Sequence, residues 1–269
     1  MTGNRFDGEI CVYCNNAPSA TDDHVFAKKF FISARRDNLP QVPCCQACNG
    51  AKAKLESELM PVLPFGGRHT DATANLTELT PRRLDKNARI ARRIRTGRTR
   101  TLVREKGIIF MGSAVPLDWI EVEELFTYIA RGVAWHEFDH LRFGPEHFVE
   151  AHTMIGHVGR VLRHLQQLRA GRRVDVDLGR QTFRYTGAQS ASNPHITVWE
   201  FEIYGGLRSE LSADEPCNIG VTTGPAAVRD RGAAMALTLN RWRRGTRLHN
   251  LSRGPRATFA ELLNYGIRS

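Results

Sequence analysis

Cysteine and polar side chains with the spacing of metal ligands are concentrated in the N-terminal part of the chain. Two Cys-x-x-Cys pairs, Cys11/Cys14 and Cys45/Cys48, provide four thiolates, the ligand set that a structural zinc ion prefers. Each pair forms a knuckle in which both sulfurs bind one ion. The four cysteines therefore predict a tetrahedral zinc site, in which Cys45 is preferred over Cys44 because only Cys45 has the two-residue spacing to Cys48.

A second set of candidate ligands, Asp23, His24 and Asn49, lies between and just after these cysteines. Carboxylate and amide oxygens suit magnesium, which keeps several water molecules and leaves room for a substrate oxygen. A neutral imidazole has a reference pKa of about 6.5 and can accept a proton from water at neutral pH. Asn49 and Lys52 are three residues apart, so they share one face of a helix. The pattern predicts a hydrolytic site for Mg²⁺ or Mn²⁺ beside the zinc.

A strand and a helix are needed to position these side chains. Residues 23–26 predict a short strand, and residues 27–36 could form a helical turn or two. Residues 38–43 should be extended, because each proline there disfavours a helical conformation in the residue before it. Apolar residues at four-residue spacing then predict a helix from Cys45 to Leu59, which Pro61 stops.

In this order, Cys-x-x-Cys, Asp-His, Asn and Cys-x-x-Cys-Asn-x-x-Lys, the motifs of residues 9–60 resemble those of zinc-stabilised HNH endonucleases. The resemblance implies a ββα-metal module that hydrolyses phosphodiester bonds. It implies that His24 is the general base and that Asp23 and Asn49 bind the catalytic ion. It further implies that Asn38 braces the loop behind His24 and that Lys52 steadies a phosphate.

The chain departs from the family pattern near the Asp-His motif. The family usually has a proline two places after Asp-His-Val, whereas this chain has Phe26-Ala27 there. Asp22 stands beside Asp23, which leaves the choice of carboxylate ligand open. These departures concern the geometry of the site rather than its class.

The charge of the chain favours a polyanionic partner. The formal net charge of the 269 residues is +10. Residues 68–113 contain 12 Lys and Arg against 4 Asp and Glu, residues 229–269 contain 9 against 2, and the segment between them is acidic. Clustered cations suit nucleic acid, because binding releases condensed counterions. Residues 1–67 have no net charge, so we expect the two basic segments to provide most of the affinity for double-stranded DNA. A soluble protein that is merely basic is the alternative.

Residues 68–113 are predicted to form a basic helical connector. Pro81 should begin a helix with an apolar side made by Leu84, Ala88, Ala91 and Ile94. Six arginines cover its remaining surface, and we expect them to contact phosphates: Arg82, Arg83, Arg89, Arg92, Arg93 and Arg95. The alternative is an ordinary solvated helix face.

Residues 114–269 are predicted to form an α+β domain. One helix should follow Asp118, another should lie near residues 155–168, and residues 233–244 favour a third. The buried stripe of the first is Val122, Leu125, Phe126, Ile129 and Val133. Alternating apolar residues between 173 and 221 predict a small antiparallel sheet. This domain would determine which DNA is recognised, or it would bind a protein partner, which could be a second copy of the chain.

The location of the protein is expected to be cytoplasmic. No stretch has the unbroken apolar length of a membrane span, and the N-terminus lacks the pattern of a secretion signal. In such a compartment, Cys-x-x-Cys pairs indicate metal binding rather than disulfides.

The whole sequence thus predicts an α+β protein with an N-terminal ββα-metal module over residues 1–67, acting as a metal-dependent DNA endonuclease. Restriction and anti-phage defence are among the settings that fit. One alternative is a zinc-ribbon DNA-binding protein that cuts nothing. Another is a metalloprotease, because His136-Glu137-Phe-Asp-His140 matches His-Glu-x-x-His, although Gly144-Pro145 should break the helix soon after.

Overall fold

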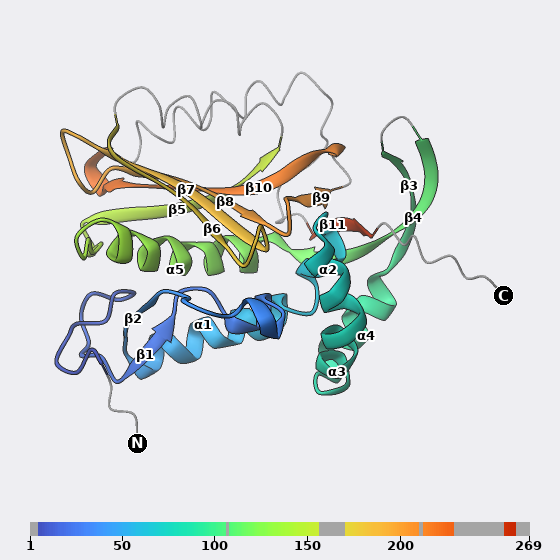
Figure 1. Ribbon diagram of the computed structural model, residues 1–269, viewed down its shortest axis with the longest axis horizontal. Helices are drawn as coiled ribbons and strands as arrows, with labels where there is room; N and C mark the ends of the chain where they lie inside the picture. The colour runs from blue at the N-terminus through green and yellow to red at the C-terminus, as the bar shows by residue number, and fades with distance from the viewer. Residues whose placement is uncertain (1–4, 106–107, 156–169, 210–211, 229–255, 262–269) are drawn as a thin grey trace.

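The computed structural model describes residues 5–105, 108–155, 170–209, 212–228 and 256–261. These residues form a mixed helical and β-sheet structure in which one long helix, α5 (Trp119–Glu137), lies between two other layers (Figure 1). A six-stranded sheet covers one side of α5, and the N-terminal strands with helix α1 (Gln46–Leu59) cover the other. The N-terminal unit is therefore packed on the rest of the chain through α5.

The N-terminal unit is an antiparallel hairpin followed by a helix. Strand β1 (Thr21–His24) pairs with β2 (Gln41–Cys44), so that His24 lies opposite Gln41. Between them lie the short 3-10 turns η1 (Lys28–Phe30) and η2 (Ser33–Arg35). The predicted helix is confirmed to end at Leu59, whereas the predicted strand lies earlier than residues 23–26.

The connector is divided into more elements than the sequence indicated. The short turn η3 (Leu63–Gly66) precedes it, and its helical part comprises α2 (Thr70–Ala74), the π-helical segment η4 (Asn75–Leu79), α3 (Thr80–Asp85) and α4 (Ala88–Gly97). The prediction of one helix across Pro81 and Ile94 is wrong, because the Asn87 side chain accepts a hydrogen bond from the Ile90 N–H at 3.2 Å and caps a new helix. Ile90 and Ile94 are the buried residues of α4, whereas Ala88 is exposed.

The connector also ends in strands rather than helix. After Gly97 the chain forms β3 (Thr99–Glu105) and β4 (Ile108–Asp118), which pair antiparallel. Strand β11 (Arg256–Glu261) joins the other edge of β4 to complete a three-stranded sheet. The domain boundary predicted after residue 113 thus falls within β4.

Helix α5 begins where β4 ends. The Asp118 side chain accepts a hydrogen bond from the Ile120 N–H at 3.0 Å and caps the helix. The whole predicted apolar stripe of α5, from Val122 to Val133, is buried, as expected for a helix covered on two sides. No helix in the described part of the chain has the length and apolar character needed to cross a membrane.

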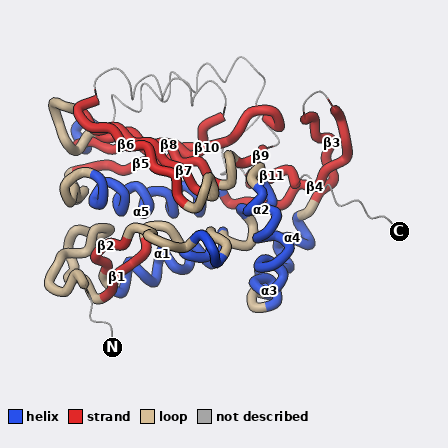
Figure 2. The backbone as a smooth tube through the Cα atoms, in the orientation of Figure 1, coloured by secondary structure: helices blue, strands red, loops and turns tan. Residues whose placement is uncertain are grey.

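The large sheet confirms the antiparallel prediction and is wider than expected. Its strands are β5 (His147–Ile155), β6 (Ala170–Leu178), β7 (Phe183–Ser190), β8 (Thr197–Ile203), β9 (Leu207–Ser209) and β10 (Ser212–Pro225). The order is β5-β10-β8-β7-β6, with β9 also pairing with β10 (Figure 2). The short turn η5 (Ala226–Val228) follows. The helices predicted at 155–168 and 233–244 lie outside the described residues, apart from Ile155, which ends β5.

One core runs from the N-terminal unit into the large sheet. The ring of Phe26 lies 4.5 Å from that of Phe183 on β7, and Phe126 of α5 lies 5.4 Å from Phe201 on β8, measured between centroids. Val25 packs against Gly132 of α5 so closely that a Cβ on this glycine would lie 2.8 Å from a Val25 methyl. The end of β1 is therefore fixed directly against α5 and the sheet.

Replacing Gly132 with alanine should force α5 away from Val25. We expect Gly132→Ala to lower the free energy of unfolding by about 1–3 kcal/mol, since both groups are buried and neither can move freely. Gly50 on α1 is a matched control, because a Cβ there meets no atom within 4 Å. Gly50→Ala should raise stability by about 0.5–1 kcal/mol through helix propensity. Urea denaturation measures the free energy of unfolding of both variants. Equal changes in the two variants would contradict the close packing of Gly132 against Val25.

Candidate metal centre and hydrolytic site

The two Cys-x-x-Cys pairs converge on one point. The Sγ atoms of Cys11, Cys14, Cys45 and Cys48 all lie within 4.8 Å of one another, and those of Cys14 and Cys45 are 3.9 Å apart. Zinc–sulfur bonds of about 2.3 Å in a tetrahedron would place sulfurs about 3.8 Å apart. The four predicted cysteines are thus close enough to hold a zinc ion.

Local backbone structure explains why the sulfurs converge. Cys45 is the N-cap of α1, and its Sγ accepts a hydrogen bond from the Cys48 N–H at 3.5 Å. Both sulfurs of the second pair therefore lie at the N-terminus of α1. Burial raises the pKa of both thiols there, and the helix dipole acts in the opposite direction. The first pair is fixed to β2 because the Val12 N–H donates to the Pro43 carbonyl at 3.0 Å.

Cys44 lies beside the cluster without belonging to it. Its buried thiol donates to the Cys45 carbonyl oxygen at 3.3 Å and also contacts Cys11. The interaction between the two sulfurs raises the pKa of Cys44, and the same interaction lowers the pKa of Cys11. The sixth cysteine, Cys217, is buried in the core, away from the cluster.

A buried lysine ties β1 to α1 beside the cysteine cluster. The Lys52 side chain is 1% exposed, and its Nζ lies 3.0 Å from Asp23 Oδ2 and 2.6 Å from Glu56 Oε1. It also donates to the His24 carbonyl oxygen at 2.8 Å. This ammonium is fully engaged inside the protein, an environment unlike that of a lysine that contacts a phosphate in solvent.

Asp23 also accepts a hydrogen bond from a tyrosine that stands within the first cysteine pair. Tyr13, which stands between Cys11 and Cys14, donates its hydroxyl to Asp23 Oδ2 at 2.6 Å. Burial, aided by the negative charge of Asp23, raises the pKa of Tyr13 well above its usual value, so the hydroxyl stays protonated. Oxygen Oδ2 is therefore held by two donors.

His24 is partly exposed at the end of β1, where it lies opposite Gln41 of β2. Burial and the nearby Lys28 lower the pKa of His24, so its imidazole remains neutral at pH values below the usual 6.5. Its Nδ1 lies 3.5 Å from the Gln41 amide nitrogen, a long contact that a water molecule could replace. The imidazole can thus accept a proton at neutral pH.

The remaining predicted ligands occupy distinct places. Asn49 lies one turn before Lys52 on α1, on the side of the helix that faces Asp23, and is partly exposed. Asn38 is an exposed turn residue in the left-handed conformation, φ 57°, and within the described residues its side chain makes no hydrogen bond. The loop behind His24 is closed instead by the Val25 N–H, which donates to the Pro40 carbonyl at 2.9 Å. Asp22 accepts from the Arg5 backbone N–H at 3.1 Å.

Sequence reasoning missed Tyr13, Glu56 and Gln41. Glu56 could have been found, because it stands four residues after Lys52 and such pairs meet on a helix. Tyr13 carries no such signal, since its contact with Asp23 depends on how the first knuckle docks on the hairpin. Gln41 becomes visible only from the register of β1 against β2.

The six predicted phosphate-binding arginines fall into two groups. Arg83 donates to the Lys29 carbonyl at 2.6 Å, Arg89 pairs with Glu58 of α1, and Arg93 lies 3.6 Å from Glu121 of α5. The ion pairs of Arg89 and Arg93 fasten α4 to α1 and α5, and the hydrogen bond of Arg83 attaches α3 to η1. The other three arginines are exposed: Arg82, Arg92 and Arg95.

The metalloprotease alternative is not supported by the helix that would have to carry it. Helix α5 ends at Glu137, and His140 has a left-handed backbone, φ 60°, so His136 and His140 do not share a helix face. Glu137 accepts the Tyr185 hydroxyl at 2.7 Å, and His140 stacks on Trp135. These residues hold the end of α5 against the sheet.

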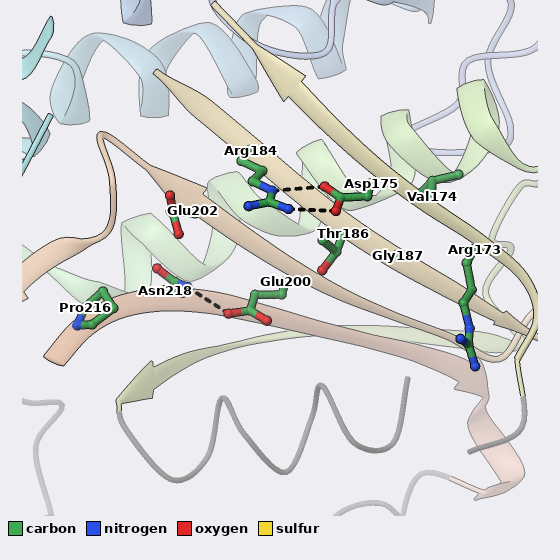
Figure 3. Close-up of a pocket in the computed structure, with 10 residues that line it drawn as sticks. All are labelled: Arg173, Val174, Asp175, Arg184, Thr186, Gly187, Glu200, Glu202, Pro216 and Asn218. Carbon is green, nitrogen blue, oxygen red and sulfur yellow. Dashed lines mark hydrogen bonds and ion pairs between the residues drawn. The ribbon is translucent and has the colours of Figure 1, made fainter. Parts of the chain in front are cut away.

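A shallow hollow lies on the face of the large sheet that is turned away from α5 (Figure 3). Much of its polar lining is paired internally. Arg184 donates to both oxygens of Asp175, at 3.0 and 2.7 Å, and Asn218 donates to Glu200 at 2.8 Å. The hollow contains none of the residues singled out in the sequence and lies on another layer from the cysteine cluster.

Comparison of the chain with family models, curated proteins and solved structures finds no match. A function for this site must therefore be argued from its own residues and geometry.

The cysteine cluster should bind one metal ion per chain. We expect Cys45→Ala to abolish zinc binding, because it removes one of four ligands together with the helix cap. Its neighbour Cys44 provides the control, and Cys44→Ala should keep one zinc per chain. Elemental analysis of the purified proteins measures the zinc content. Retention of zinc by Cys45→Ala with loss from Cys44→Ala would contradict the ligand assignment.

The Lys52 side chain should contribute strongly to stability. In Lys52→Met, the carboxylates of Asp23 and Glu56 would lose their shared cation, and removal of one partner from a buried ion pair costs about 3–5 kcal/mol. Lys54, exposed on the same helix, is the control, and Lys54→Met should change stability by less than about 0.5 kcal/mol. If urea denaturation gave both variants the same stability, the buried cluster would not have this role.

Proposed function

We propose that this chain is a metal-dependent endonuclease of the HNH type, with β1, β2 and α1 forming a ββα-metal module. The observation that carries the proposal is that Asp23 of β1 contacts both Lys52 of α1 and Tyr13, which stands between the first two cysteines of the four-cysteine cluster. Asn49 lies one helical turn before Lys52 on the same helix. The proposal also takes support from the basic surface of the connector.

The charge of the Lys52 cluster suits an added cation. Two carboxylates, Asp23 and Glu56, share one ammonium. Because Asp23 Oδ2 already has two donors, Oδ1 is the oxygen left to bind a metal ion, and the Asn49 amide oxygen would be its partner ligand. A bound Mg²⁺ or Mn²⁺ would polarise the phosphate and stabilise the departing 3′-oxygen.

His24 would act as the general base. Its neutral imidazole takes a proton from a water molecule, the resulting hydroxide attacks phosphorus, and the bond from phosphorus to the 3′-oxygen breaks. The lowered pKa of His24 fits this role, because the base must be unprotonated to act.

Lys52 has a different role from the one that the family resemblance implies. With Nζ buried against Asp23, Glu56 and the His24 carbonyl, it positions the ligand and the base rather than binding a phosphate. Phosphate contacts would come from arginines on α4, which the pairing of Arg89 with Glu58 fixes against the same helix α1.

Supercoiled plasmid in Mg²⁺ or Mn²⁺ tests the proposal. The wild type should nick it, and His24→Ala should slow nicking by about 10²–10⁴-fold through loss of the base. The control is His152→Ala, which removes a half-exposed histidine on β5 and should leave the rate unchanged.

Two results would contradict the proposal. Nicking that persists in His24→Ala would show that this histidine is not the base. DNA binding by the wild type without cleavage in either metal would favour the zinc-ribbon DNA-binding protein, which needs only the cysteine cluster.

A further inference from the structure

Strands β3 and β4 form a two-stranded ribbon that extends away from the rest of the described chain (Figures 1 and 2). Strand β11 pairs with β4 only from Ser113 to Asp118. From Ile108 to Gly112, β4 therefore has β3 as its only described neighbour. A two-stranded ribbon of this kind has the width that the major groove of DNA accepts.

One face of this ribbon exposes large apolar side chains. Ile109 is 65% exposed and Met111 is 58% exposed, and their spacing of two residues places them on the same face of β4. Side chains of this size are usually covered in a folded protein, so a pair on a projecting ribbon indicates a contact surface.

Arginines lie at the base of this face and in the helix that precedes the ribbon. Arg100 lies opposite Ser113 in the register, so it shares the face of Met111 and Ile109. Arg98 donates to the Ser113 hydroxyl at 2.8 Å, and Arg92 and Arg95 are exposed on α4 just before the ribbon. From Lys86 to Arg104 the sequence contains no acidic residue.

We propose that the β3–β4 ribbon is a DNA-binding arm that enters a groove of the duplex. Arg92, Arg95 and Arg100 contact phosphates, while Ile109 and Met111 pack against base edges and sugars inside the groove. This inference rests on the proposed function only in taking double-stranded DNA as the substrate.

The charge around the apolar pair favours DNA over a second copy of this chain. A symmetric contact between two copies would bring each face against the same face of its partner. The arginines of the two copies would then approach one another without acidic partners from this segment, which is unfavourable. Duplex DNA offers partners for both parts of this surface, because its phosphates can pair with the arginines while its bases and sugars contact the apolar side chains.

Fluorescence anisotropy with a labelled duplex tests the arm in the His24→Ala background, which prevents cleavage. Ile109→Ser with Met111→Ser should weaken binding about tenfold and leave the salt dependence unchanged, because the lost contacts are apolar. Arg95→Gln with Arg100→Gln should reduce the slope of log K against log salt by about 2, since each phosphate contact contributes about 0.9. The control is Ile120→Ser, because Ile120 is 63% exposed in the first turn of α5, outside the ribbon.

The outcomes separate this inference from the nuclease proposal. If the arm variants are folded and bind the duplex with the same affinity as the His24→Ala parent, the proposal that the ribbon binds DNA is wrong, whether or not the wild type cuts DNA. A wild type that binds through the arm and fails to nick would overturn the nuclease alone. If light scattering showed a wild-type dimer that Ile109→Ser with Met111→Ser breaks, the face would be a self-association surface and the arm proposal would be wrong.

Discussion

The buried ammonium of Lys52 is the interaction on which the N-terminal unit depends. A cation with 1% of its side chain exposed is stable only if carboxylates and carbonyls replace its water, and here Asp23, Glu56 and the His24 carbonyl do so. These three groups belong to β1 and α1, so the charge requirement of one side chain fixes the distance between the strand and the helix. Tyr13 extends the network to the first cysteine pair by donating to Asp23.

The cysteine cluster and the Lys52 cluster act on the same helix from two positions. The cysteines hold the N-terminus of α1, where Cys45 and Cys48 lie, and Lys52 holds its middle. A unit with only two short strands has little core of its own, so buried charge, and metal ligation where the four cysteines hold an ion, would stabilise what packing alone cannot. Beyond His24 the chain enters the common core, because Val25 meets Gly132 and Phe26 meets Phe183. The candidate base therefore stands between a charged network and an apolar core.

The sequence was informative where local spacing determines structure. The two-residue spacing of the cysteines, the period of α1 and α5, and the alternation in the large sheet all correspond to what the structure contains. It was uninformative where distant segments decide the outcome. The division of the connector at Asn87 depends on a cap that competes with a continuous apolar stripe. The β3–β4 ribbon lies largely within the residues predicted to form the helical connector. The burial of Lys52 follows from the approach of β1, which no spacing within α1 reveals.

We propose that this small N-terminal unit binds two different ions, a structural one on four sulfurs and a hydrolytic one at Asp23 and Asn49. Crystals of His24→Ala with duplex DNA and Mn²⁺, measured at the zinc and manganese absorption edges, test it directly. The account predicts a zinc peak among the sulfurs of Cys11, Cys14, Cys45 and Cys48 and a separate manganese peak bound by Asp23 Oδ1 and the Asn49 amide oxygen. A zinc peak alone, with Asp23 and Asn49 free of manganese beside bound DNA, would contradict it.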